Sequence, residues 1–149
     1  MAAEETHRKW LLDAIDLSKQ CPKSSSSFAV GAIIIDEHGA FVSSGYSLEL
    51  GPATHAEENA IQKASQEGIC LEGLTIYCSL EPCSVRKSRP WSCTDLIIEH
   101  GLGRVFFALK EPPVFVNGQG TAKLRDQGIM VECWPELGPL VESINQHLL

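Results

Sequence analysis

The sequence lacks both an excess of positive charge and any long hydrophobic run. Lys and Arg together number 12 against 19 Asp and Glu, so the formal net charge is −7. Such a chain has no broad positive field with which to collect nucleic acid, and a polynucleotide substrate is disfavoured. Charged residues interrupt the apolar positions of the first twenty residues. We therefore expect no signal peptide, no membrane span and a cytoplasmic location.

The sequence also lacks the cysteine and histidine spacings of a disulfide framework or of a structural zinc finger. In a reducing compartment the even number of cysteines, six, carries little weight. Most cysteines and histidines have no companion at ligand-like spacing. We expect four cysteines to act as small hydrophobic residues and four histidines to be solvated or at helix ends: Cys21, Cys70, Cys78 and Cys133, and His7, His38, His100 and His147.

No internal repeat, linker or second core is visible, and 149 residues fit one domain spanning 1–149. A chain of this length buries roughly 70% of its unfolded surface. Neither a metal nor a disulfide is therefore needed merely to keep it folded. The 44% hydrophobic and 21% charged content is typical of an ordinary globular protein.

Hydrophobic periodicity predicts an alternation of helices and strands. Helices are expected at 4–20, 55–66, 92–99, 121–126 and 136–149, and strands at 28–35, 40–47, 74–80, 104–109 and 129–133. The first two strands should form an antiparallel hairpin. The helix between the fourth and fifth strands implies a crossover and parallel pairing. The predicted fold is a three-layer α/β/α domain with a five-stranded mixed sheet, whose binding site lies beyond the carboxyl ends of the strands.

Residues with metal-binding chemistry gather in three short segments. These are Thr54-His55-Ala56-Glu57, Glu81-Pro82-Cys83 and Cys93, with nine residues between the two cysteines. One imidazole and two thiolates give a tetrahedral Zn²⁺ three protein ligands and leave the fourth position for water. A nearby unligated carboxylate, Glu57, then serves as general acid and base. This layout is catalytic, because a structural site normally closes its fourth position with another Cys or His.

The same segments have a simpler interpretation as helix caps. Thr54-x-x-Glu57 has the form of a capping box, in which the Glu57 carboxylate would accept a bond from the backbone of Thr54. Ser92-x-x-Asp95 resembles the same device. In the first segment the capping and catalytic interpretations compete for one carboxylate. Together the two caps predict that His55 and Cys93 each begin a helix and that the two helix amino ends meet at one point.

Several segments resemble the cytidine deaminase superfamily: Phe28-x-Val30-Gly31-Ala32, His55-Ala56-Glu57 and Glu81-Pro82-Cys83. The long gap between the cysteines and the Cys93-to-Ile98 segment look most like the pyrimidine deaminases of riboflavin biosynthesis. The Gly45-to-Leu50 segment and Cys83-Ser84-x-Arg86 are similar to the fungal form. The resemblance implies a stand-alone zinc deaminase that acts on a ribosylaminopyrimidine 5′-phosphate, forms a homodimer or homotetramer, and replaces a ring amino group by a carbonyl oxygen.

Two departures from the bacterial pattern lie where substrate is held. Ser26-Ser27-Phe28 stands in place of Pro-Asn-Pro, and Val85 in place of a histidine. Deamination of another free base or nucleoside, and a non-catalytic zinc-stabilised module, therefore stay open as alternatives.

A basic loop offers candidates for substrate contacts. It holds Arg86 and Lys87 in an otherwise acidic chain, and we predict a phosphate clamp, with a solvated loop as the alternative. Ser27 and Glu49, next to strand ends, are predicted to contact the base or ribose.

Overall fold

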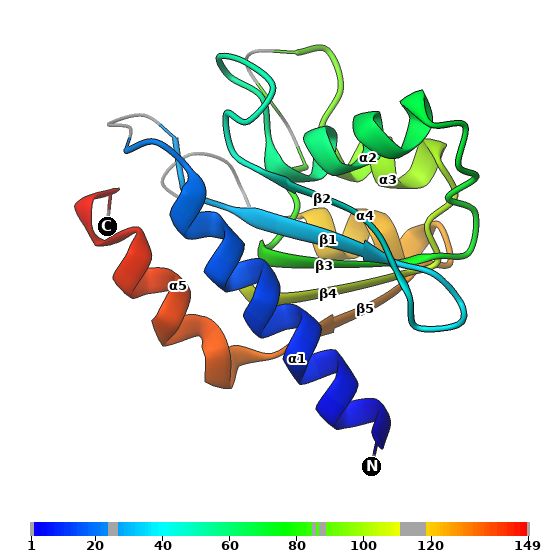
Figure 1. Cartoon of the computed structure of the whole chain (residues 1–149), viewed down its shortest axis with the longest axis horizontal. Helices are drawn as coiled ribbons and strands as arrows, with labels where there is room; N and C mark the ends of the chain where they lie inside the picture. Colours follow the sequence, from blue (N-terminus) through cyan, green and yellow to red (C-terminus); the bar gives the residue numbers. More distant parts are fainter. Residues whose placement is uncertain (1, 24–26, 85, 87–88, 111–118, 149) are drawn as a thin grey trace.

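Five strands form one mixed sheet in the order β2-β1-β3-β4-β5, with helices on both faces (Figure 1). The computed structural model describes residues 2–23, 27–84, 86, 89–110 and 119–148. The strands are β1 (Gly31–Ile35), β2 (Phe41–Tyr46), β3 (Thr75–Leu80), β4 (Arg104–Leu109) and β5 (Met130–Cys133). The α-helices are α1 (Ala2–Leu17), α2 (Ala56–Gln66), α3 (Cys93–Glu99), α4 (Gly120–Asp126) and α5 (Gly138–Ile144), and the short 3₁₀ helices are η1 (Ser18–Gln20), η2 (Pro135–Leu137) and η3 (Gln146–Leu148).

The predicted α/β/α architecture is confirmed. α1 and α5 cover one face of the sheet, while α2, α3 and α4 cover the other (Figure 1). β1 pairs antiparallel with both β2 and β3, and β3, β4 and β5 run parallel to one another. Within the described residues no helix is long and apolar enough to cross a membrane.

The central strands are buried because helices pack on both of their faces. Every residue of β1 is buried, β3 is buried except at its first residue, and β4 is buried except at its two ends. This explains their continuous apolar runs. The edge strands β2 and β5 alternate between more and less exposed residues, as expected where one face meets solvent.

Two glycines allow the helices to approach the sheet closely. A Cβ atom on Gly31 would come within 1.9 Å of the Ala14 carbonyl oxygen in α1. A Cβ atom on Gly45 would come within 2.3 Å of the Ala56 carbonyl oxygen in α2. The second contact sets the distance between α2 and the sheet. It therefore also sets the position of His55, the residue that precedes α2.

The first strand begins later than the predicted residue 28. The Ala29 N–H donates to Asn145 Oδ1 at 2.7 Å, and Asn145 Nδ2 donates to the Ala29 carbonyl at 3.1 Å. The Val30 N–H donates to Ser47 Oγ at 3.0 Å. Side-chain bonds thus take the place of part of the strand ladder here, and β1 starts at Gly31.

Two of the predicted helices are interrupted. The 4–20 prediction becomes α1 followed by the 3₁₀ turn η1, and the 136–149 prediction becomes η2, α5 and η3. Pro139 has no N–H to give to a preceding turn and lies at the start of α5, which explains why the α-helix begins only at Gly138.

The prediction for His7 is wrong, because this side chain is half-buried in the middle of α1 and packs against the sheet. Its Nδ1 lies 2.6 Å from Tyr77 Oη, and its ring stacks on Phe106 with centroids 4.3 Å apart. Burial, followed by the charge of Arg104, lowers the pKa of His7. His7 therefore joins α1 to the sheet as a packed neutral side chain.

Candidate zinc site

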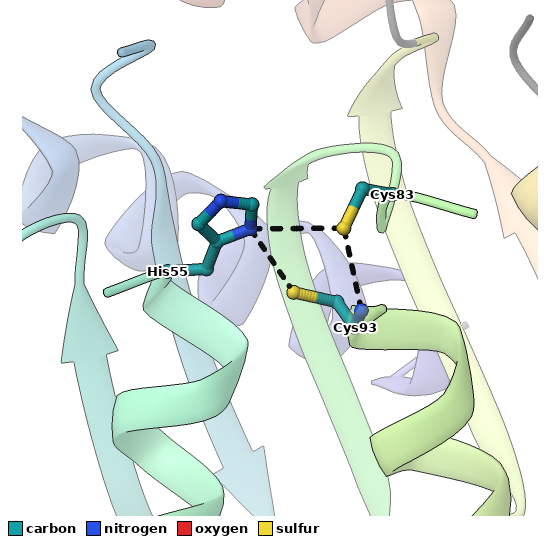
Figure 2. A group of neighbouring side chains, drawn as sticks. All are labelled: His55, Cys83 and Cys93. Carbon is teal, nitrogen blue, oxygen red and sulfur yellow. Dashed lines mark hydrogen bonds between the residues drawn. The ribbon is translucent and has the colours of Figure 1, made fainter. Parts of the chain in front are cut away.

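His55, Cys83 and Cys93 lie together at the ends of three different elements (Figure 2). His55 precedes α2, Cys83 follows β3, and Cys93 is the first residue of α3. Their ligand atoms lie within 4.8 Å of one another. The predicted convergence of two helix amino ends, with a strand end between them, is confirmed.

The spacing of the donor atoms matches tetrahedral zinc. His55 Nδ1 lies 3.3 Å from Cys93 Sγ and 3.7 Å from Cys83 Sγ. Zinc bonds of about 2.0–2.3 Å in a tetrahedron separate ligand atoms by about 3.3–3.8 Å. Nδ1 is the ring nitrogen that faces both sulfurs (Figure 2). The two distances from the imidazole therefore suit one Zn²⁺, and all three donor atoms lie within 4.8 Å of one another.

The local electrostatics favour one thiolate before a metal arrives. The hydrogen bond from the Cys93 thiol lowers the pKa of Cys83 to about 5, and the same interaction raises the pKa of Cys93. The Cys93 backbone N–H, at the start of α3, also donates to Cys83 Sγ at 3.3 Å. Orphan amides and a positive dipole at a helix amino end stabilise thiolate over thiol, so Cys83 is prepared as a metal ligand.

Glu57 is 3% exposed and lies beside the three ligands. Burial, followed by the charge of the Cys83 thiolate, raises the pKa of Glu57 to about 7, while a hydrogen bond with Cys93 acts in the opposite direction. A carboxyl group with this pKa can both accept and release a proton near neutral pH. The arrangement supplies a general acid and base next to a metal position.

The capping prediction for the second helix is wrong in its residues. The N-cap is His55, not Thr54, and the carboxylate that accepts its backbone N–H is Glu58 Oε1, at 3.0 Å. The Thr54 hydroxyl instead donates to the Gly51 carbonyl at 2.8 Å. The capping and catalytic roles thus fall on two different carboxylates, and Glu57 is left to the metal site.

The capping prediction for the third helix is confirmed. Ser92 is the N-cap, its Oγ accepts the Asp95 N–H at 3.2 Å, and Asp95 Oδ2 accepts the Ser92 N–H at 2.7 Å. Cys93 then begins α3 as predicted. The capping box of Ser92 and Asp95 thus fixes the helix start that carries Cys93.

Helix α4 braces the turn that carries Cys83. Thr121 donates to Glu81 Oε2 through both its N–H, at 3.1 Å, and its hydroxyl, at 2.6 Å. Lys123 bridges from α4 to Asp95 of α3 at 2.6 Å. A Cβ atom on Gly120 would come within 2.3 Å of the Pro82 carbonyl oxygen. Close packing and buried hydrogen bonds therefore hold Glu81-Pro82-Cys83 in place.

The predicted substrate-binding residues are spread around the site. Glu49 Oε2 pairs with Lys63 Nζ at 2.7 Å, and Glu49 Oε1 accepts the Tyr46 N–H at 3.4 Å. Ser27 is half-buried on the approach to β1. Lys87, like Val85 and Ser26, lies outside the described residues. Contacts of Ser27, Glu49 and Lys87 with a substrate stay predictions.

Arg86, predicted to clamp a substrate phosphate, makes contacts within the protein, and its contact with a phosphate stays a prediction. Its side chain is 2% exposed, and its Nη1 lies 2.9 Å from Glu58 Oε1. Its Nη2 donates to the Ala53 carbonyl at 2.6 Å. Trp91 flanks the guanidinium, with Cζ 5.0 Å from the ring centroid.

Sequence reasoning missed two residues that shape the site. The capping role of Glu58 could not be predicted, because His55-x-x-Glu58 and Thr54-x-x-Glu57 have the same spacing. Cys78, predicted to be a plain hydrophobic residue, is fully buried in β3, and burial together with its hydrogen bond to Glu57 raises its pKa. Cys70, for which the same prediction was made, is exposed.

Comparison with known proteins places the chain among deaminases. Residues 4–109 match the family described as the cytidine and deoxycytidylate deaminase zinc-binding region. A diaminohydroxyphosphoribosylamino-pyrimidine deaminase of Schizosaccharomyces pombe is 41% identical over 127 residues, which cover 84% of this chain and 31% of that protein. A protein of the same name from Buchnera aphidicola is 32% identical over 84% of this chain and 82% of its own length.

A solved structure resembles the fold closely. The Thermotoga maritima diaminohydroxyphosphoribosylaminopyrimidine deaminase/5-amino-6-(5-phosphoribosylamino)uracil reductase superposes with a TM-score of 0.85 at 31% identity, covering 97% of this chain and 40% of that one. The chain thus spans 31% of the Schizosaccharomyces pombe protein and 40% of the Thermotoga maritima protein.

Proposed function

We propose that this chain, which belongs to the cytidine and deoxycytidylate deaminase zinc-binding family, catalyses hydrolytic deamination of a ribosylaminopyrimidine 5′-phosphate in riboflavin biosynthesis. The observation that carries the proposal is the grouping of His55, Cys83 and Cys93 beside a buried Glu57 that is not the helix-capping carboxylate. In the reaction, water adds at the ring carbon that bears the amino group, ammonia leaves, and a carbonyl remains.

The residues present would hold one Zn²⁺ through His55 Nδ1, Cys83 Sγ and Cys93 Sγ. When bound, such an ion lowers the pKa of a coordinated water to roughly 7 and so supplies hydroxide at neutral pH. Side chains of this protein would carry out the proton transfers.

Glu57 moves the protons. Its carboxylate accepts a proton from the attacking water and donates it to a ring nitrogen. It then accepts the second proton from the added hydroxyl and donates it to the amino group, which leaves as ammonia while the carbonyl forms. The raised pKa of about 7 supports this role, because the same group must gain and lose a proton within one turnover. Burial of Glu57 also keeps competing bulk water away from the carboxylate.

The substrate is proposed from the relatives, two of which are named as deaminases of this ribosylaminopyrimidine. The Buchnera aphidicola protein matters most, because the alignment covers 82% of its length. We also propose that residues 1–149 form one deaminase domain, that the enzyme works in the cytoplasm, and that it associates as a homodimer or homotetramer.

Ammonia release from a panel of substrates tests this function. The panel contains the ribosylaminopyrimidine 5′-phosphate, its dephosphorylated form, cytidine, cytosine, guanine and their phosphates. We expect the highest kcat/KM for the phosphorylated riboflavin precursor. Preference for another base or nucleoside would overturn the substrate assignment but keep the deaminase, whereas no release from any compound by zinc-loaded protein would support a non-catalytic module.

A further inference from the structure

One guanidinium group ties together the chain on both sides of the histidine ligand. Arg86 lies in the loop between the two cysteine ligands, three residues after Cys83. Its Nη2 donates to the carbonyl of Ala53, two residues before His55, and its Nη1 donates to Glu58, three residues after His55. Arg86 therefore links the segment that carries the imidazole to the segment that carries the thiolates.

Glu58 completes the link through one oxygen atom. Its Oε1 accepts both the backbone N–H of His55, at 3.0 Å, and Arg86 Nη1, at 2.9 Å. Arg89 Nε lies 3.8 Å from the other oxygen, Oε2. The Glu58 carboxylate thus fixes the backbone of His55 and forms ion pairs with Arg86 and Arg89 of the loop.

The pair is buried, which makes it sensitive to the loss of either member. The side chains of Arg86 and Glu58 are 2% and 9% exposed. A buried ion pair contributes little against an apolar replacement of both partners, but removing one partner leaves an uncompensated charge. Such a pair has its clearest use where it fixes one arrangement of groups among several.

The backbone next to His55 needs such support. Ala53 adopts φ +62°, a left-handed conformation that an alanine rarely takes and that costs energy. The bond from Arg86 to the Ala53 carbonyl holds this turn where the chain enters α2. His55 lies two residues after Ala53, so a relaxed turn would move the imidazole relative to the sulfurs.

We propose that Glu58 and Arg86 are positioning residues of the metal centre, which hold His55 Nδ1 against Cys83 and Cys93 and so strengthen zinc binding. The inference rests on the proposed function only in taking these three residues as the zinc ligands. It assigns Arg86 to the protein rather than to the substrate phosphate, because both of its Nη atoms donate within the protein and its side chain is almost fully buried.

Zinc affinity, measured by competition with a chromophoric chelator, tests the proposal without reference to turnover. We expect Glu58→Gln and Arg86→Met each to weaken zinc binding about 10- to 100-fold, the range found when groups that orient metal ligands are removed. Glu58→Gln keeps an oxygen that can accept the His55 N–H. A weaker affinity for zinc in this variant would therefore reflect the missing charge of Glu58. The double variant should bind zinc no more weakly than the worse single variant, because the two residues act as one unit.

Two further variants keep the result interpretable. Lys63→Gln removes a partly buried ion pair elsewhere on α2, with Glu49, and should leave zinc affinity unchanged. Arg86→Lys keeps the charge but cannot make the paired contacts, and should give an intermediate affinity even if Arg86→Met folds poorly. The absorption spectrum of the cobalt-loaded variants reports the ligand geometry directly and should change for Glu58→Gln but not for Lys63→Gln.

Zinc binding within about twofold of wild type in both Glu58→Gln and Arg86→Lys, with an unchanged cobalt spectrum, would overturn the proposal. If Arg86→Lys then raised KM only for phosphorylated substrates, Arg86 would be a phosphate ligand instead. Absence of zinc binding by the unsubstituted protein is a different result, since it would remove the zinc site and the proposed deaminase together.

Discussion

The two helices that begin at the metal site, α2 and α3, start in different ways. At α3 the cap and the ligand are separate residues, since Ser92 caps the helix and Cys93 follows as ligand. At α2 the ligand His55 is itself the N-cap, its side chain turns toward the sulfurs, and Glu58 supplies the bond to its backbone. The first helix start is ordinary capping, whereas the second depends on a buried ion pair and leaves Glu57 for chemistry.

The two helix starts differ in how many specific residues each of them requires. A hydroxyl cap needs only a serine and an acid three residues later. The α2 start needs a left-handed alanine, a buried carboxylate and an arginine from a distant loop. Substitutions at the two helix starts should therefore have unequal effects.

Loss of a ligand at either helix start should abolish the site. We expect His55→Ala and Cys93→Ala each to reduce bound zinc to near zero and to eliminate ammonia release, because two remaining ligands hold Zn²⁺ poorly. Metal analysis after gel filtration measures the zinc. The matched control is Cys70→Ala, an exposed thiol away from the site, which should retain one zinc per chain.

Glu57→Gln should separate chemistry from metal binding at the α2 start. Turnover should fall by at least about 10²-fold, because an amide cannot accept and return the proton. Zinc content should stay at the wild-type level, since His55, Cys83 and Cys93 are intact. Near-normal turnover with zinc bound would remove Glu57 from the mechanism.

Ser92→Ala should test the α3 start. Loss of the capping hydroxyl should lower the free energy of unfolding by about 1 kcal/mol and the Tm by roughly 3 °C. Calorimetry on zinc-loaded protein measures both. Ser92→Thr keeps a capping hydroxyl and should stay close to wild type, and an equal loss in the two variants would mean that capping is not what Ser92 contributes.

His7 provides a pH dependence that comes from neither helix start. Its pKa is lowered on folding, so the unfolded chain binds the proton more tightly and stability falls as the pH drops below about 6.5. His7→Gln should remove this part of the slope. Urea unfolding of the wild type and of His7→Gln at pH 7.5 and pH 5.5 measures this dependence. The wild type should lose more free energy of unfolding between the two pH values, and an equal loss in both proteins would show that His7 is not involved.

Much of the fold and the metal ligands could be predicted from the sequence, because their signals are local. Apolar periodicity predicted all five strands, and the cap at Ser92 was visible in four residues. His55, Cys83 and Cys93 stood out because few residue types bind zinc.

The remainder depends on contacts that spacing does not encode. The backbone angles of His55 and its bond to Glu58 show that it, rather than Thr54, is the cap. The partner of Arg86 lies 28 residues away, that of His7 lies 70 residues away, and Asn145 reaches Ala29 across 116 residues. Each of these contacts exists only once the sheet has brought its elements together.

X-ray absorption at the zinc edge, on protein purified with its metal, tests the central claim most directly. We expect one zinc per chain with one nitrogen and two sulfur ligands from the protein and one oxygen from water. A fourth protein ligand, sulfur or nitrogen, in place of the water oxygen would contradict the catalytic site described above. Protein that binds no zinc would contradict it as well.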